Sequence, residues 1–455
     1  MAGIGFELKK MMAGKGWLGV AQAYTYSGII GSGPWVLSIL GILLASALGL
    51  SRSGVDQSAE FMSSVTYLIA TSLVLSGVLQ LLFVRFMADR VYEGKAEWVL
   101  PNLLGALTIM SVIAGVIGST IALLWFRHDP VYALLMLVNF VVLCNLWLTV
   151  VFVSGLKQYQ AVLLLFFISY ALLLLLAWLL RTGGTLGGLL AVLAGHSTLL
   201  LTLLVLVMRE YQGEAIPRFD FMQRRWIHPS LIITGVLFNL GVWIDKWIFW
   251  FAPTTSDTVN GVLRASIIYD TPFFLAYLSI IPGMAVFLIK VETDFVETYQ
   301  RYYSAVNGQG TLSEIQTYRQ DMVKSIRDAF KSIFFVQSLC VLLFFWLADD
   351  ILAWLNLSPL FVHLYRIDLF ATLLQVLFLT TLSISFYFNL LRQALWMCLL
   401  LTLANALLTL LSLWLGATFY GYGFALALLL ATAAGIAALS AKLNRLEYLT
   451  FMMQR

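Results

Sequence analysis

Runs of about 20 apolar residues, separated by polar breaks, recur along the whole sequence. Such a run is long enough to cross the hydrocarbon core of a bilayer as an α-helix. Only 11% of the residues are charged and 61% are hydrophobic, which leaves too little charge to cover the surface of a large water-soluble protein. The pattern predicts an all-α polytopic membrane protein with twelve transmembrane helices, near residues 22–49, 61–86, 98–125, 131–155, 160–180, 186–208, 230–252, 266–289, 332–348, 367–391, 394–416 and 421–442.

The basic residues are unevenly divided between the two ends of these spans. Of the 27 Lys and Arg residues, 21 fall in the segments on the side of the N-terminus and one, Lys246, falls inside a span. The remaining five lie in the segments on the opposite side: Arg52, Arg127, Arg181, Arg264 and Arg366. Because cytoplasmic segments of membrane proteins are enriched in Lys and Arg, the bias predicts that both termini are cytoplasmic.

A long polar break at residues 209–229 divides the predicted spans into two groups of six. We therefore expect an N-terminal six-helix bundle at 1–208, which starts with an interfacial helix, and a C-terminal six-helix bundle at 230–455. Residues 209–229 would form a cytoplasmic linker. Transporters built from two such halves bind their substrate between them, so this organisation favours a transport function.

The largest polar region, residues 290–331, predicts a cytoplasmic helical hairpin. We expect helices at 291–305 and 311–331, joined by a turn at 307–310. Thr311 and Glu314 have the spacing of a capping box, which starts the second helix. The hairpin would either dock a partner protein or simply extend the two spans that it joins.

The seventh predicted span carries a polar and aromatic stripe. Asn239, Trp243, Lys246 and Trp250 follow one another at i, i+4, i+7 and i+11, which places them on one helical face. Indole rings stack on sugar faces and amides form hydrogen bonds with hydroxyl groups. We interpret this face, together with Trp247, as one wall of a substrate path. Trp250 also suits the aromatic belt at a membrane surface.

Charged groups inside a span cost about 2.5–3.5 kcal/mol each on insertion scales and usually face protein or a water-filled cavity. Asp245 and Lys246 are such groups, and Asp270 opens the next span. These three residues are candidates for a charge pair or an ion site. Because adjacent helical positions do not face each other, we expect Asp245 to pair with a neighbouring helix as much as with Lys246. The alternatives are an ion pair that only fixes helix register, and a helix-capping role for Asp270.

The first span contains the sequence Gly31-Ser32-Gly33-Pro34. Proline removes a backbone donor and glycine loosens a helix, so we expect a kink formed by Gly31, Gly33 and Pro34. Transporter sites often lie at interrupted helices. Three aromatic residues flank the kink and are further candidates for the substrate path: Tyr24, Tyr26 and Trp35. The alternative is a kink that serves only close helix packing.

Motifs of catalysis and metal binding are missing from the sequence. Gly14-Lys15 and Gly94-Lys95 lack the Ser or Thr that completes a phosphate-binding loop. The four histidines do not cluster, and the three cysteines lie in apolar segments without metal-binding spacing. We therefore predict a protein that is not an enzyme and that uses no cofactor and no metal.

Three segments of the sequence resemble a known family. They are MAGIGFELKK at the start, SGIIGSGPW at 27–35 and GVWIDKWIFW at 241–250. They are similar to the Pel exopolysaccharide transporters of the PelG family, a distant branch of the MOP superfamily of multidrug (MATE) and polysaccharide flippases. The resemblance implies two six-helix bundles around a central cavity that is lined by bent first and seventh spans. It also implies a complex in the bacterial inner membrane.

For function, the resemblance implies export of a polymer rich in N-acetylgalactosamine to the periplasm for the biofilm matrix. The implied partners are PelD-like and PelE-like membrane proteins and a PelF-like cytoplasmic glycosyltransferase. Three alternatives remain: an ion-coupled drug or lipid-linked oligosaccharide exporter of the same fold, a membrane scaffold that recruits the polymer synthase, and a facilitator-type transporter. The last rests on a partial loop motif at Asp89-Arg90 and Gly94-Lys95, in which Arg85 replaces an expected glycine.

Overall fold

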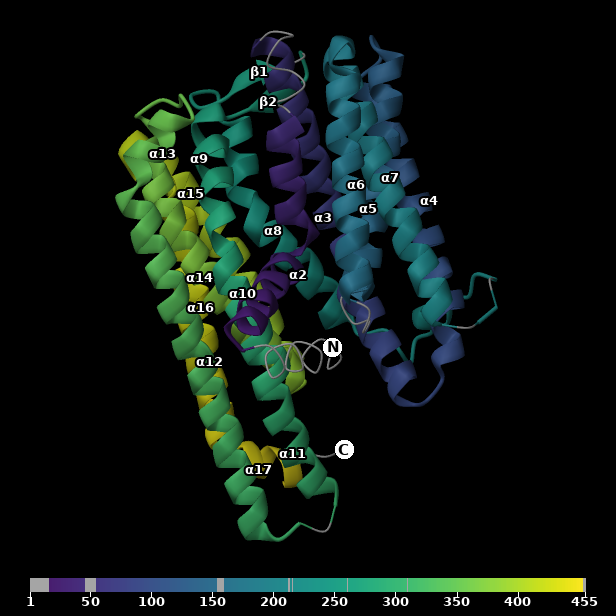
Figure 1. Ribbon diagram of the computed structural model, residues 1–455, viewed down its shortest axis with the longest axis vertical. Helices are drawn as coiled ribbons and strands as arrows, with labels where there is room; N and C mark the ends of the chain where they lie inside the picture. Colours follow the sequence, from purple (N-terminus) through teal and green to yellow (C-terminus); the bar gives the residue numbers. More distant parts are fainter. Residues whose placement is uncertain are drawn as a thin grey trace. The chain divides into compact units, whose positions relative to one another are not determined.

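The computed structural model describes residues 16–45, 55–153, 159–211, 213–214, 216–259, 261–308 and 310–452. The chain divides into two compact units (Figure 1). Unit 1 comprises the chain up to Gly33 together with Ile268 onward, and unit 2 comprises Pro34–Ile267. The predicted interfacial helix at the N-terminus lies outside the described residues.

Unit 2 is a helical bundle built around α3 and α5. Helix α5 packs against α3, α4 and α7, while α3 also packs against α8 and α7 packs against α6. Its elements are the second part of α2 (Gly16–Ala45), α3 (Val55–Tyr92), η2 (Ala96–Trp98), α4 (Val99–Trp125), α5 (Pro130–Val153), α6 (Tyr159–Leu179), η3 (Arg181–Gly183), α7 (Gly184–Glu210), η4 (Asp220–Met222), α8 (Pro229–Phe251) and a hairpin of β1 (Asp257–Val259) with β2 (Leu263–Ala265).

Unit 1 contains the first part of α2 and the helices that follow the β-hairpin. Helix α15 packs against α16, and α14 contacts both of them as well as α12 and α10. Its elements are α9 (Ile267–Tyr277), η5 (Leu278–Ile280), α10 (Ile281–Ile289), the π-helix η6 (Lys290–Phe295), α11 (Val296–Asn307), α12 (Leu312–Trp346), α13 (Ala348–Trp354), α14 (Phe361–Tyr387), α15 (Leu391–Leu415), η7 (Ala417–Phe419), α16 (Tyr422–Asn444) and α17 (Leu446–Met452).

Eleven helical segments of the described chain are long and apolar enough to cross a membrane. They correspond in order to the second through twelfth predicted spans, so the prediction of an all-helical, multi-pass membrane protein is confirmed. The first predicted span falls in α2, which is not among the eleven. The count of twelve and the cytoplasmic position of the termini therefore stay predictions.

The predicted hairpin at 290–331 is continuous with the membrane span that follows it. Helix α12 runs without a break from Leu312 to Trp346, so the predicted second helix and the ninth span are one helix. No proline or glycine interrupts that stretch of sequence, which explains the continuity. The capping box is confirmed, because the Thr311 hydroxyl accepts a hydrogen bond from the backbone of Glu314 and the Glu314 carboxylate accepts one from the backbone of Thr311.

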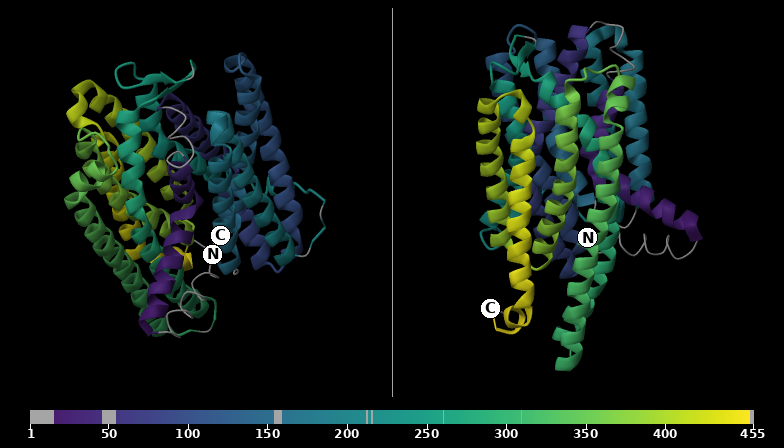
Figure 2. Two further views of the ribbon diagram at one scale, coloured as in Figure 1. Left: turned by 45° about the horizontal axis from the view of Figure 1, so that its top comes forward. Right: turned by 90° about the vertical axis from the view of Figure 1, so that its left-hand side faces the viewer.

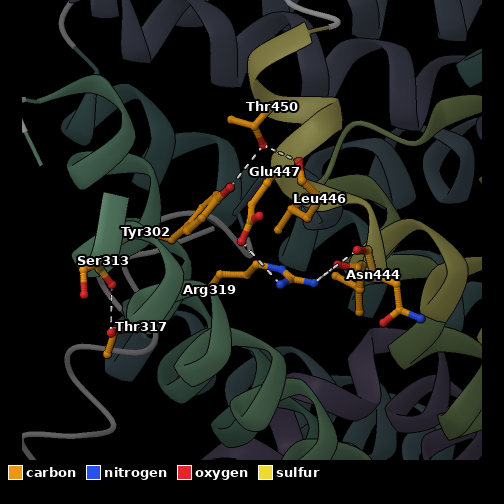
Figure 3. A network of polar contacts seen from close by, with 9 residues as sticks. Tyr302, Ser313, Thr317, Arg319, Asn444, Leu446, Glu447 and Thr450 are labelled. Carbon is orange, nitrogen blue, oxygen red and sulfur yellow. Dashed lines mark hydrogen bonds and ion pairs between the residues drawn. The ribbon is translucent and has the colours of Figure 1, made fainter. Parts of the chain in front are cut away.

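Helix α11 and the first part of α12 extend together past the other helices of unit 1 (Figure 2). The C-terminal helix α17 packs beside them through a small polar network (Figure 3). Arg319 forms an ion pair with Glu447 at 3.4 Å and donates a hydrogen bond to the carbonyl of Leu443 at 3.1 Å. The Tyr302 hydroxyl lies 3.3 Å from that of Thr450. The extension is thus clamped on one side by the end of the chain.

The two compact units do not follow the predicted division at residues 209–229, because α8 packs against α3 inside unit 2. The described part of the predicted linker also packs on unit 2. The Asn102 amide oxygen accepts a hydrogen bond from the backbone of Asp220 at 2.9 Å, and the Arg218 backbone donates one to Pro101 at 2.9 Å. The division of the chain into two six-helix bundles, at 1–208 and 230–455, stays a prediction.

Candidate functional site

The candidate site is built on α8, whose sequence favours a long membrane helix. Pro229 lies at its first turn, where the missing amide donor costs nothing. The four residues of the predicted stripe, Asn239, Trp243, Lys246 and Trp250, are all buried, with at most 7% of each exposed. The stripe is therefore packed against protein in this conformation.

Helix α8 crosses α3 in direct backbone contact at Gly77 and Gly235. A Cβ atom added to Gly77 would lie 2.6 Å from the carbonyl oxygen of Gly235, and one added to Gly235 would overlap the carbonyl of Gly77. Asn239 donates a hydrogen bond to the carbonyl of Gly235 at 3.1 Å, one turn earlier on the same helix. The amide of the stripe thus sits beside the closest crossing point of the two helices.

Asp245 and Lys246 form an ion pair with each other. Lys246 Nζ lies 2.9 Å from Asp245 Oδ2 and 3.1 Å from Oδ1, and it also donates to the carbonyl of Val242 at 2.9 Å. Both side chains are 0% exposed. The Asp245–Lys246 contact is the charge pair that the sequence offered, and it forms because the long lysine side chain folds back toward the helix N-terminus and reaches the adjacent carboxylate. The result is a buried polar group without net charge.

The tryptophans of α8 have different surroundings. Trp250 stacks on Tyr67 of α3, with ring centroids 4.4 Å apart and planes inclined by 25°. Trp243 is buried, whereas Trp247 is half-buried and lines an apolar cavity between α3, α4 and α5. The indole nitrogen of Trp247 is buried and has no hydrogen-bond partner among the described residues.

The remaining predicted site residues lie elsewhere in the chain. Tyr24 and Tyr26 are half-buried in the part of α2 that belongs to unit 1. Helix α2 is continuous through Gly31, Gly33 and Pro34, although the boundary between the units falls between the last two; the kink stays a prediction. The side chain of Trp35 lies outside the described set. Asp270 lies in the first turn of α9, as expected of a residue near a helix start, and belongs to unit 1.

The eighth span is one continuous helical stretch, Ile267–Asn307, that changes from α to 3-10 geometry at residues 278–280 and to a π turn at 290–295. These changes were not predicted. A side chain completes the backbone hydrogen bonding at the first change. The fully buried Gln337 of α12 accepts from the backbone N–H of Gly283 at 3.0 Å and donates to the carbonyl of Ser279 at 3.0 Å. Those two backbone groups are four residues apart and would pair directly in a regular helix. Gln337 is thus inserted into the hydrogen-bond ladder of the eighth span, next to Pro282.

A second polar cluster lies farther along the same span. The π-helix Lys290–Phe295 carries Glu292, which is 5% exposed. Its carboxylate accepts a hydrogen bond from the Tyr387 hydroxyl of α14 at 2.6 Å, and Tyr299 donates to the backbone of Tyr387. Single π turns are frequent at functional sites. The sequence predicts Glu292 at the start of a helix of the cytoplasmic hairpin and gives no sign of its pairing with Tyr387; an acidic residue directly after an apolar run was the only signal.

These arrangements combine indole faces, an amide and a buried ion pair on one helix. Within the described ranges, no group of three His, Cys, Asp or Glu side chains is placed to hold a metal ion.

Comparison with known proteins agrees with a transporter fold. One similar solved structure is that of an outward-facing multidrug resistance MATE transporter of the MOP superfamily. Its TM-score is 0.67 at 15% identity, over 94% of this chain and 96% of that one. A MOP superfamily transporter from Pyrococcus furiosus has a TM-score of 0.67 at 14% identity, covering 93% and 96%. A variant of the Vibrio cholerae MATE transporter VcmN has a TM-score of 0.65 at 14% identity, covering 98% and 97%. At these identities the similarity establishes the fold alone.

No curated protein matches the sequence. One family model covers nearly the whole chain, residues 1–451; it is that of PelG, described as "Putative exopolysaccharide Exporter (EPS-E)". The match agrees with the three segments noted above, and the MOP transporter fold is the one that the resemblance implied. The chain belongs to the PelG family of exopolysaccharide exporters.

Proposed function

We propose that this transporter moves a Pel-type polysaccharide, rich in N-acetylgalactosamine, from the cytoplasm to the periplasm across the bacterial inner membrane, and that the stripe on α8 forms one wall of its path. The observation that carries the second claim is the buried Asp245–Lys246 pair on the helix that also buries Trp243 and Asn239. An ion pair without net charge, on one helix with an indole and an amide, is suited to an uncharged sugar chain.

The buried state of the stripe implies that the path opens by movement of α8. Burial of Asn239, Trp243 and Lys246 against protein represents a closed wall. The glycine crossing at Gly77 and Gly235 brings the two backbones together without intervening side chains, which suits a pivot. Opening about this point exposes the outer half of the stripe to the sugar.

The ion-coupled alternative is less well supported by the same geometry. A proton or metal cation that binds Asp245 must first displace the ammonium group 2.9 Å away. The lysine thus already occupies the place that a coupling cation needs. We therefore assign the energy input to elongation of the polymer by a cytoplasmic synthase, which pushes the chain outward.

The partners follow from the family and from the shape of unit 1. We assign the α11–α12 extension as the docking element for a PelF-like glycosyltransferase, with PelD-like and PelE-like proteins in the membrane. Arg319 in this extension is joined to Glu447 by an ion pair and to the carbonyl of Leu443 by a hydrogen bond, which supports the extension. In this proposal the scaffold role accompanies transport and does not replace it.

The proposal is tested by comparing two variants for secreted polymer at equal protein levels in the membrane. Replacement of Trp243 by alanine should abolish secretion while the synthase remains bound. Removal of the turn at residues 307–310 should release the synthase. If the Trp243→Ala variant secretes normally and only the turn deletion matters, the protein is a scaffold and the transport path is wrong.

A further inference from the structure

An apolar cavity of about 290 Å³ lies in unit 2 between α3, α4 and α5, with Trp247 of α8 also in its lining. The lining is almost entirely hydrocarbon, with Val74, Ile117 and Phe140 among the contributing residues. Water in such a cavity has few hydrogen-bond partners. The volume equals that of roughly ten water-sized groups, which is suited to part of one hydrocarbon chain.

The cavity runs along the helices through one half of the membrane. Its lining extends on α3 from Tyr67 to Leu75 and on α4 from Ile117 to Trp125. Eight residues of helix rise about 12 Å, close to half of the roughly 30 Å hydrocarbon core. Helix α4 also presents outward-facing apolar side chains, with Val116 63% exposed and Trp125 53% exposed. The cavity therefore adjoins a surface that faces lipid.

Two arginines lie near one end of the cavity, one just after α4 and one in β2. Arg127 directly follows Phe126, and Arg264 directly follows Leu263; both Phe126 and Leu263 line the cavity. The Arg127 Nε donates to the carbonyl of Leu123 at 2.9 Å, and its two terminal nitrogens have no partner among the residues that the structure describes. Guanidinium groups bind phosphate oxygens strongly and with defined geometry.

From this geometry we propose that the cavity binds one acyl chain of an anionic phospholipid of the outer leaflet, whose phosphate is held by Arg127. The assignment to the outer leaflet follows the charge bias of the sequence, in which Arg127 and Arg264 are two of the five basic residues on the outer side. The charge of Arg127 selects an anionic headgroup, and the apolar lining accepts the chain.

The bound acyl chain would contact side chains of α8 and of the residues that pack against α8. Trp247 lines the cavity one residue after Lys246, and Tyr67 lines it while stacking on Trp250. Occupation by lipid fills the space behind these rings. The inference concerns a lipid and does not depend on the identity of the exported sugar.

The test uses the full-length protein in vesicles of phosphatidylethanolamine that contain phosphatidylglycerol with a photoreactive group near the end of one acyl chain. After illumination, labelled peptides are identified by mass spectrometry. We expect labelling in the segments 67–75, 117–126 and 133–140. Labelling spread evenly over all lipid-facing helices contradicts the proposal, and this readout needs no substitution.

Two kinds of variant refine the test. Ala122→Phe combined with Ala133→Phe fills the cavity and should reduce labelling at least tenfold, whereas Val116→Phe on the outer face of α4 should leave it unchanged. Arg127→Gln should lower the preference for phosphatidylglycerol over equally labelled phosphatidylethanolamine about fivefold. Unchanged labelling of the filled variant overturns the cavity assignment. Displacement by an isoprenoid phosphate at an equal mole fraction, but not by unlabelled phosphatidylglycerol, overturns the choice of a phospholipid.

Discussion

Lys246 Nζ lies 2.9 Å from the carboxylate of Asp245, the residue directly before it in α8, and both side chains are fully buried. Neither charge is exposed to solvent. Removing one partner takes the nearest opposite charge away from the other, and breaking a buried ion pair costs about 3–5 kcal/mol.

Single substitution of the pair should therefore destabilise the protein more than double substitution. We expect Lys246→Met alone to lower the midpoint of thermal unfolding in detergent strongly, and Asp245→Asn with Lys246→Met to recover much of the loss. The measurement is thermal unfolding of the three purified proteins. A double variant less stable than both single variants would show that the pair has no mutual dependence.

The helix crossing at Gly77 and Gly235 should not tolerate a methyl group. Gly77→Ala forces α3 and α8 apart, because the new Cβ would lie 2.6 Å from the carbonyl oxygen of Gly235. We expect a loss of about 1–3 kcal/mol from overpacking, and reduced secretion. The matched control is Gly115→Ala in α4, where nothing lies within 4 Å of the new atom. Equal stability of the two variants would contradict the close crossing.

Loss of the Gln337 amide should weaken the eighth span. Gln337→Leu leaves the backbone N–H of Gly283 and the carbonyl of Ser279 unpaired and buried, at a cost of about 1–3 kcal/mol for each group. Hydrogen exchange of the Gly283 amide should accelerate. The control is Gln316→Leu on the exposed face of α12, for which no change is expected. Slow exchange at Gly283 in the Gln337→Leu variant would show that the amide does not support the change of geometry.

The clamp between α12 and α17 should depend on one arginine. Arg319→Ala removes the contacts with Glu447 and Leu443, so α17 should detach and become sensitive to protease. The control is Arg301→Ala in α11, whose ion pair with Glu297 lies within the same helix. If both variants resist protease equally, α17 is held by its other contacts, which include the hydroxyl pair of Tyr302 and Thr450.

Much of the fold was predictable because span length and charge bias act locally. Eleven spans follow from apolar runs, and the capping box at Thr311 follows from the spacing of two residues. Pro282 is a local signal for irregular geometry in the eighth span. The insertion of Gln337 was not predictable, because it joins residues 54 positions apart and leaves no local pattern.

The site was predictable only in part, for a similar reason. The helical wheel placed Asn239, Trp243, Lys246 and Trp250 on one face of α8, and all four are buried; that this face lines a sugar path stays a prediction. The wheel could not show how closely Asp245 and Lys246 pair, because it represents Cβ directions and a lysine side chain is long enough to fold back to its neighbour. The Glu292–Tyr387 hydrogen bond joins residues 95 positions apart and was hidden for the same reason as Gln337.

The central claim is that the stripe on α8 contacts the exported sugar chain. The most direct measurement places a photoreactive amino acid at position 243 in cells with an active synthase and asks whether illumination captures polymer on the protein. The matched control places it at Ile233, which is 48% exposed on the same helix. Capture at position 243, absent at position 233 and absent when the synthase is inactive, is the predicted result. Equal capture at both positions, or none at position 243 during active secretion, would contradict a sugar path along α8.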